Sequence, residues 1–250
     1  MSFLSIQNLS KEFGKLHAVN DVSFDVEKGN TLAIIGPNGA GKSTFFNLVT
    51  GSFPVSAGKV IFKGENITNL PPYAIVNKGI SRSFQVSNIF PDLTTFENVR
   101  IGVLSHRKES LKLFTAIKKM DRVKEETINI LKAIGLEDKM TLAANTLSHG
   151  DQKSLEIGIA LTNEPELLLL DEPTAGMGPE ETLSTVNLIK DVSMKRSVTI
   201  IFTEHDLNVV FSISDRVIVL QQGMIIADGK PEEVRGNKRV REAYLGGEIS

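Results

Sequence analysis

The strongest indication of architecture is TLAIIGPNGAGKST, residues 31–44. From Gly36 onward it matches the phosphate-binding pattern GxxxxGK[ST]. The apolar residues before the pattern predict a short buried strand, and TFFNLVT after Ser43 predicts a helix that is closed by Gly51. Because strand, loop and helix follow one another as the pattern requires, a glycine-rich turn with a chance lysine is the weaker interpretation.

Each part of this loop has a physical role in holding a nucleoside triphosphate. Glycines let the backbone wind so that N–H groups point at phosphate oxygens, and the helix N-terminus adds partial positive charge. Lys42 is expected to reach the β- and γ-phosphates, and the Ser43 hydroxyl to ligate Mg²⁺. The nucleotide-binding residues predicted here are Gly36, Asn38, Gly39, Ala40, Gly41, Lys42, Ser43 and Thr44.

A second apolar strand, within ELLLLDEP at residues 166–173, ends in two carboxylates. Asp171 stands at the carboxyl end of this strand, where a magnesium-holding carboxylate is expected. Adjacent carboxylates after an apolar strand are costly unless cations and water offset them. One of the pair can hold the metal while the other orients or deprotonates water. The alternative is that Asp171 and Glu172 merely end the strand before Pro173.

Two further polar residues follow predicted strands, Gln85 after ISRSF and His205 after TIIFTE. Both would lie at the same edge as the carboxylates if the sheet is parallel. Alone, either residue would more often belong to an ordinary loop, but their shared placement favours a site. His17 and His106 have no such placement and are interpreted as surface residues.

Strands that alternate with helices predict a largely parallel α/β core within a single domain, residues 1–250. FLSIQNLSKEF and AVNDVSFDVEKG alternate like strands and predict an antiparallel sheet at the N-terminus. Residues 90–163 read as mostly helical and are expected to form an inserted subdomain, with Thr94 and Glu97 at capping-box spacing. Residues 1–89 and 164–250 would form the catalytic core. RVIVLQQGMIIADG, residues 216–229, predicts a terminal hairpin.

Composition narrows the class of protein. Apolar residues make up 41% of the chain and charged residues 23%, which predicts a packed core. A net charge of −2 argues against a protein that coats nucleic acid. The chain has no cysteine, so disulfides and thiolate metal sites are excluded, in keeping with a reducing cytoplasm. No apolar run approaches the roughly 18 residues of a membrane span, and the start lacks the features of a secretory signal.

The stretch TLSHGDQ, residues 146–152, precedes a helical segment and admits two interpretations. Ser148 can cap the helix, and Gly150 would let a phosphate approach the backbone. Simple capping is the first interpretation. The second is an anion site, which would be redundant beside the first loop unless it serves the nucleotide of another molecule.

The motifs GPNGAGKST, SFQ, LSHGDQ, LLLLDEP and TEHD occur in the order found in the ATP-binding subunits of ABC transporters, and the chain resembles that family over essentially its whole length. The resemblance implies a P-loop NTPase fold, with ATP and Mg²⁺ as ligands. It also implies two ATPase domains that face each other head to tail. Ser148 and Gly150 would then contact the γ-phosphate of the ATP bound by the other subunit.

The resemblance also implies roles for individual residues. Phe13 would stack on adenine, Glu172 would be the catalytic base, and His205 the switch histidine. Gln85 would sense both magnesium and the transmembrane partner, and is counted with the catalytic residues. The implied magnesium ligands are Ser43, Gln85 and Asp171.

The chain departs from the family pattern at two places. The signature is usually LSGGQ, but here His149 replaces the first glycine and Asp151 the glutamine. The loop usually written SALD reads Ala175-Gly-Met-Gly178, so the contact normally assigned to its aspartate has no counterpart. Both variants, with the closing AYLGG, are similar to the subfamily that serves branched-chain amino-acid uptake. Urea and amide importers are also similar.

The implied function is an ATPase that energises a membrane importer of branched-chain amino acids from the cytoplasmic face of the inner (plasma) membrane. Its expected partners are transmembrane permease subunits, a second ATPase subunit (a second copy or a paralogue) and, indirectly, a periplasmic substrate-binding protein. No nucleic-acid partner is expected.

Three alternatives are weighed against this function. The first is the ATPase of a urea or amide importer. The second is a soluble ABC-type protein of DNA repair or translation, which usually has two ATPase domains or a long coiled-coil insertion, and neither is evident here. The third is a P-loop kinase for small molecules, which would not need LSHGDQ. Its lid would carry clustered arginines, whereas Arg100, Arg107 and Arg122 form no cluster.

Overall fold

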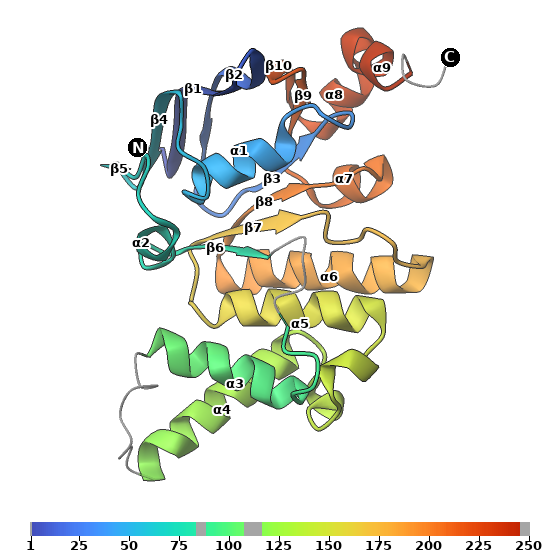
Figure 1. The fold of residues 1–250 in the computed structure, drawn as a ribbon. Coiled ribbons are helices and arrows are strands. Elements are labelled where there is room, and N and C mark those ends of the chain that lie inside the picture. Colours follow the sequence, from blue (N-terminus) through green and yellow to red (C-terminus); the bar gives the residue numbers. More distant parts are fainter. Residues whose placement is uncertain (1, 84–88, 108–116, 246–250) are drawn as a thin grey trace.

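The fold was obtained as a computed structural model that describes residues 2–83, 89–107 and 117–245 (Figure 1). It contains two sheets. The first is antiparallel, in the order β2-β1-β4-β5, and the second has six strands in the order β10-β9-β3-β8-β7-β6. The strands of the first sheet are β1 (Leu4–Phe13), β2 (Leu16–Val26), β4 (Ala57–Phe62) and β5 (Glu65–Asn66). The predicted antiparallel sheet at the N-terminus is therefore confirmed.

The second sheet is parallel except at one edge. Its parallel strands are β3 (Thr31–Ile35), β6 (Ile80–Ser83), β7 (Leu167–Asp171), β8 (Thr199–Thr203) and β9 (Arg216–Gln221), and β10 (Met224–Gly229) runs antiparallel to β9. Every residue of β3, β7 and β8 is buried. This explains their continuous apolar sequences, because strands of a parallel sheet are covered on both faces.

The helices lie on both sides of the second sheet. Figure 1 shows α1 between the two sheets, while α6, then α5, and then α3 and α4 extend from the opposite face. The helices are α1 (Lys42–Val49), α2 (Pro72–Val76), α3 (Thr95–His106), α4 (Ile117–Ala133), α5 (His149–Leu161), α6 (Pro179–Arg196), α7 (Leu207–Ile213), α8 (Pro231–Gly236) and α9 (Lys238–Leu245), with short 3₁₀ turns at Glu137–Lys139 and Ala144–Thr146. None of the helices in these ranges has the length and apolarity that crossing a membrane requires.

Two apolar cores flank the central sheet. Leu32 and Ile34 of β3 pack with Phe45 and Phe46 of α1 in the core between the sheets. The residues that alternate with these along β3, such as Ala33, face the second core, to which the helices from α3 to α7 also contribute side chains. The two-residue alternation of strand side chains thus divides one apolar sequence between two cores. Their packing fixes the carboxyl ends of β3, β7 and β8 along one edge.

The predicted P-loop NTPase architecture, a mainly parallel sheet with an N-terminal antiparallel sheet, is confirmed. The capping box is confirmed as well, since Thr94 and Glu97 exchange hydrogen bonds at the start of α3. The predicted hairpin is confirmed, since β9 and β10 pair antiparallel, but it is not terminal, because α8 and α9 follow it. β9 is also a parallel neighbour of β3. The division at residues 90–163 stays a prediction, since α5 contacts α3 and α4 but also α6 and β6.

Candidate functional site

The loop between β3 and α1 depends on glycine where other backbone segments come close. Gly36 has φ 152, and a Cβ there would lie 2.1 Å from the Leu220 carbonyl oxygen. Gly41 has φ 105, and its Cβ would lie 2.3 Å from the Ala18 carbonyl oxygen. A side chain at either position would displace a neighbouring strand or turn. The loop shape that the sequence predicts is therefore imposed by the surrounding backbone as well.

Lys42, the first residue of α1, folds back over this loop. Its Nζ donates hydrogen bonds to the carbonyl oxygens of Gly36 at 2.7 Å and Pro37 at 3.3 Å. Burial lowers the pKa of Lys42, against the opposite effect of the nearby Glu172 and Asp171 carboxylates. The ammonium group is thus partly desolvated, and its hydrogen-bond acceptors are backbone carbonyls. Because these acceptors carry no net charge, the ammonium group can form a charge-assisted hydrogen bond with a bound phosphate.

A cavity of about 680 Å³ extends from this loop to the first antiparallel strand. Phe13 lies at its wall and is 45% exposed, so its ring is accessible to a ligand in the cavity. The Phe13 ring meets the Phe53 ring edge-on, with centroids 5.7 Å apart, and Lys11 Nζ lies 4.9 Å from its centroid. The loop residues that line the cavity are Asn38, Gly39, Ala40, Gly41, Lys42, Ser43 and Thr44.

The same cavity includes residues that sequence reasoning did not select. His17 is exposed, as a surface residue would be, but it lines this cavity beside Leu16 and Ala18. Gln222, in the turn between β9 and β10, lines it as well. All four belong to turns and strands that carry no nucleotide motif, and only the tertiary fold brings them to the loop.

Asp171, at the end of β7, is almost completely buried and held at both carboxylate oxygens. Thr203 Oγ1 donates to Oδ1 at 2.7 Å, and Arg82 donates to Oδ2 at 2.7 Å. The Arg82 side chain is 7% exposed and also donates to Asn47 Oδ1, on α1, at 2.6 Å. Neither Arg82 nor Thr203 was predicted from the sequence as a site residue. An arginine within the otherwise buried strand ISRS was the available signal, because a buried charge requires a partner.

Glu172 follows in a left-handed conformation, with φ 49. Its backbone N–H donates to the carbonyl and hydroxyl oxygens of Thr203, each at 3.1 Å. Its carboxylate Oε1 lies 2.8 Å from His205 Nε2. A non-glycine residue in this conformation is strained and is kept there only by its surroundings. The turn directs the side chain to the wall of the cavity, so the predicted grouping of Asp171, Glu172 and His205 at one edge is observed.

A third carboxylate, Glu204, supports this arrangement and was also missed. It is buried, and it accepts hydrogen bonds from the Thr174 N–H at 2.8 Å and from the Thr174 hydroxyl. Its other oxygen accepts from the His205 N–H at 2.9 Å. Glu204 therefore joins the segment that follows Glu172 to the backbone of His205. Gln85 falls outside the described residues, two positions after the end of β6.

Ser148 and Gly150 lie at the start of α5 and do not line the cavity of Lys42. Ser148 Oγ accepts from the Asp151 N–H at 3.2 Å, so the capping interpretation is confirmed. His149 Nε2 lies 3.0 Å from the Ala175 carbonyl oxygen, which ties this loop to the segment after Glu172. The second interpretation, an anion site for another molecule, stays a prediction.

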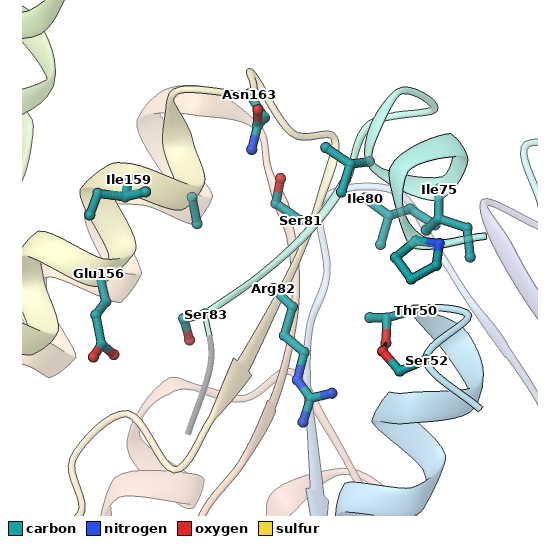
Figure 2. Close-up of a pocket in the computed structure, with 13 residues that line it drawn as sticks. Thr50, Ser52, Ile75, Ile80, Ser81, Arg82, Ser83, Glu156, Ile159 and Asn163 are labelled. Carbon is teal, nitrogen blue, oxygen red and sulfur yellow. Dashed lines mark hydrogen bonds between the residues drawn. The ribbon is translucent and has the colours of Figure 1, made fainter. Parts of the chain in front are cut away.

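A smaller cavity, about 160 Å³, lies along β6, between α2 and α5, and is lined by both Ser81 and Arg82 (Figure 2). Figure 2 shows Ser81 and Arg82 pointing to opposite sides of the strand. Ser81 Oγ and Glu156 Oε1, both buried in its wall, have no hydrogen-bond partner within the ranges that the structure describes. The cavity thus combines apolar walls with polar groups that a partner could engage.

Known proteins resemble this chain over its whole length. The model of the ABC transporter family matches residues 19–175, and that of the branched-chain amino acid ATP-binding cassette transporters matches residues 224–249. The high-affinity branched-chain amino acid transport ATP-binding protein BraF of Pseudomonas aeruginosa is 38% identical over 248 residues, with 97% of each chain covered. LivG of Escherichia coli, with the same description, is 36% identical over 250 residues at the same coverage.

The solved structures agree with these matches. The ADP conformation of MJ1267, an ATP-binding cassette of an ABC transporter, superposes with a TM-score of 0.87 at 33% identity. The alignment covers 98% of this chain and 99% of that one. The shared fold therefore includes the loop, the strands and the helices that surround the cavity.

Proposed function

The chain belongs to the ABC transporter family of ATP-binding subunits and is an ATPase, and from this premise we propose that it energises an importer of branched-chain amino acids. The observation that carries the proposal is the cavity in which Phe13, the phosphate-binding loop and Glu172 meet. The match at residues 224–249 and the relatives BraF and LivG favour branched-chain amino acids over urea or amides.

ATP binding is assigned to groups in this cavity. The Phe13 ring would stack on adenine, because it is partly exposed and meets the Phe53 ring only in an edge-type contact. The backbone N–H groups of residues 38–44 and the Lys42 ammonium would hold the phosphates. Because these groups stand on a rigid strand–loop–helix unit, little reorganisation is needed when the nucleotide enters.

Mg²⁺ would be held jointly by the protein and the phosphates. Within residues 2–83, 89–107 and 117–245, no group of three or more His, Cys, Asp or Glu side chains could hold a metal ion. Mg²⁺ commonly needs only one or two protein ligands beside phosphate oxygens and water. The Asp171 carboxylate and the Ser43 hydroxyl fit this requirement, with Gln85 as the further ligand that the family resemblance implies. When bound, the ion would neutralise charge on the phosphate oxygens.

Hydrolysis is assigned to Glu172. Its carboxylate would orient the attacking water and accept its proton. The left-handed backbone conformation of Glu172 directs this side chain to the cavity, and the contact with His205 holds the carboxylate in place. Asp171 has both oxygens engaged by Thr203 and Arg82, so its orientation is set before the nucleotide arrives. The two adjacent carboxylates thus have different surroundings and different roles.

Two ATPase subunits would act as a pair, either two copies or this chain with a paralogue. Ser148 and Gly150 are outside the cavity of their own chain, so they can contact a nucleotide only if another subunit presents it. Each α5 N-terminus would then close on the γ-phosphate held by the opposite subunit. Hydrolysis would remove that link and reopen the pair.

The membrane partner would be a pair of permease subunits supplied by a periplasmic binding protein, with this chain at the cytoplasmic face. β6, which precedes Gln85 in the chain, contributes Arg82 both to the cavity of Figure 2 and to the contact with Asp171, which supports a docking position on this side. A partner seated there could affect the metal carboxylate through Arg82.

Substrate uptake tests the proposal. In cells from which the gene is deleted, uptake of radiolabelled leucine should fall, and the parent chain should restore it. Lys42→Ala should fail to restore uptake although the protein accumulates normally. Unchanged leucine uptake with lost urea uptake would assign the chain to a urea importer instead.

A further inference from the structure

Glu181, in the first turn of α6, lies directly over the start of α5. The Gly150 N–H donates to Glu181 Oε1 at 3.2 Å. Hydrogen bonds from the Ser148 hydroxyl, then the Gly150 N–H and the Gly178 N–H, hold the pKa of Glu181 below its usual range, against a smaller effect of desolvation. The carboxylate is therefore bound as an anion by the start of the neighbouring helix.

Two of these donors, Ser148 and Gly150, are the groups that the proposed function gives to the γ-phosphate of a partner's ATP. A hydroxyl can accept from Asp151 and still donate once, so it serves either the carboxylate or a phosphate oxygen. The Gly150 N–H likewise makes one good bond. Space is equally limited, because a Cβ built on Gly150 would lie 3.0 Å from Glu181 Cβ and 3.1 Å from Oε1.

We propose that Glu181 is a positioning residue that occupies the phosphate donors of Ser148 and Gly150 in its own chain and is displaced by the γ-phosphate of the opposite subunit. The inference rests on the proposed function in trans. The carboxylate keeps the loop in an anion-binding geometry, and it opposes pairing until ATP competes successfully for the same donors.

Displacement would also move a second segment. Gly178, the N-cap of the helix that carries Glu181, ends the stretch Ala175–Gly178, and His149 contacts the Ala175 carbonyl oxygen at 3.0 Å. Loss of the Glu181 contacts would leave the His149 contact with Ala175 in place between the two loops. Arrival of the partner's nucleotide is thereby transmitted to the residues that directly follow Glu172.

The neighbouring Glu180 provides a matched control. It carries the same charge in the same turn of α6, but it is exposed and makes no hydrogen bond to the start of α5 among the described contacts. Alanine at either position removes one charge from the helix N-terminus, so the general effect on α6 is the same. Only the change at 181 frees Ser148 and Gly150.

The first experiment uses the isolated subunit without nucleotide. Inorganic phosphate is titrated at constant ionic strength while the Gly150 amide is followed by NMR. In Glu181→Ala, and more weakly in Glu181→Gln, phosphate should shift this amide, whereas the parent and Glu180→Ala should stay unchanged. Equal shifts in parent and Glu181→Ala, or a Gly150 amide that does not respond to either substitution at 181, would overturn the proposal. Melting temperatures confirm that the variants are folded.

The second experiment measures pairing on a Glu172→Gln background by sedimentation against MgATP. Glu181→Ala should lower the MgATP concentration for half-maximal pairing by about fivefold, the upper range for a partly exposed charged contact. Glu180→Ala should not. A higher requirement in Glu181→Ala would show that the carboxylate assists pairing and would contradict the proposal. If the Glu172→Gln parent never pairs, self-pairing is wrong, and the phosphate titration alone decides the role of Glu181.

Discussion

His205 Nε2 lies 2.8 Å from Glu172 Oε1, across the edge of two strands that are neighbours in the sheet but 33 residues apart in sequence. The contact leaves the second carboxylate oxygen, Oε2, for a water molecule. It also means that the Glu172 carboxylate, the proposed general base, is positioned by the fold before any nucleotide is present, which makes its role directly testable.

Glu172→Gln should keep ATP binding and lose hydrolysis. The substitution retains size and one carbonyl oxygen but removes the proton acceptor, and loss of a general base typically costs about 10²–10⁴ in rate. Phosphate release under single-turnover conditions measures the effect, with Glu180→Gln as control. Hydrolysis at the parent rate would reduce Glu172 to a strand-end carboxylate. An inactive variant that stays monomeric with MgATP would instead indicate a paralogue as the natural partner.

Phe13→Ala should weaken ATP binding about tenfold or more, since base–aromatic stacking is worth roughly 1–3 kcal/mol. The melting temperature should change little because the ring is 45% exposed. Phe90→Ala removes another exposed ring, outside the cavity, and should leave affinity unchanged. Titration with a fluorescent ATP analogue distinguishes the two variants. Unaltered affinity in Phe13→Ala would remove this residue from the site.

Ser148→Arg should stop hydrolysis while the isolated subunit still binds ATP, because the arginine enters the proposed contact between subunits. It should also cost about 1 kcal/mol of stability, since a helix cap is lost. Thr94→Arg destroys the equivalent cap of α3 and serves as the matched control. Specific activity is measured with the melting temperature. If both variants lose stability and both keep their turnover per folded molecule, Ser148 is a cap and nothing more.

Arg82→Met should destabilise the fold by about 3–5 kcal/mol, because it leaves the Asp171 carboxylate buried without its cation. Arg216 makes a comparable pair with Asp228, but the two side chains are 34% and 30% exposed. Arg216→Met should therefore cost only about 0–1 kcal/mol. Urea denaturation of the two variants measures the difference. Equal losses would show that Arg82 does not compensate Asp171.

Glu166 makes a pH-dependent contribution to stability. Lys63, followed by Lys28, holds the pKa of Glu166 below its usual range. A carboxyl with a lowered folded pKa stabilises the protein above the unfolded pKa of about 4.3, and this stability is lost as the pH falls through the folded value. Glu166→Gln should thus lower the melting temperature at neutral pH, and the difference from the parent should shrink in acid. A difference that is constant from neutral to acidic pH would contradict the assignment.

The parts of the site that could be predicted from the sequence are those whose residues are adjacent in the chain. The loop at 36–44 is such a case, because its glycines, lysine and hydroxyls are adjacent and their chemistry follows from their order. The pairing of β9 with β10 was also found. The place of β9 beside β3 was not, because apolar runs do not say which strand lies next to them.

The missed residues act across long separations. Arg82 contacts Asp171 from 89 positions away, and Glu204 contacts Thr174 from 30. Such contacts depend on the register between strands and on the direction of each side chain, and a short stretch of sequence predicts neither. Glu181 was missed for the same reason, since only the packing of α6 against α5 brings it to Gly150.

Side chains alternate between the two sides of β6, and this limits where members of the family can gain or lose residues. Ser81 and Arg82 both line the cavity of Figure 2 but point to opposite sides of β6, and Arg82 reaches Asp171. Deleting or inserting one residue upstream within the strand would rotate every later side chain to the opposite face. A serine would then stand against the buried carboxylate, and the arginine would point away from it. Insertions and deletions should therefore be tolerated in the turn before Ile80 and selected against within the four residues that follow it.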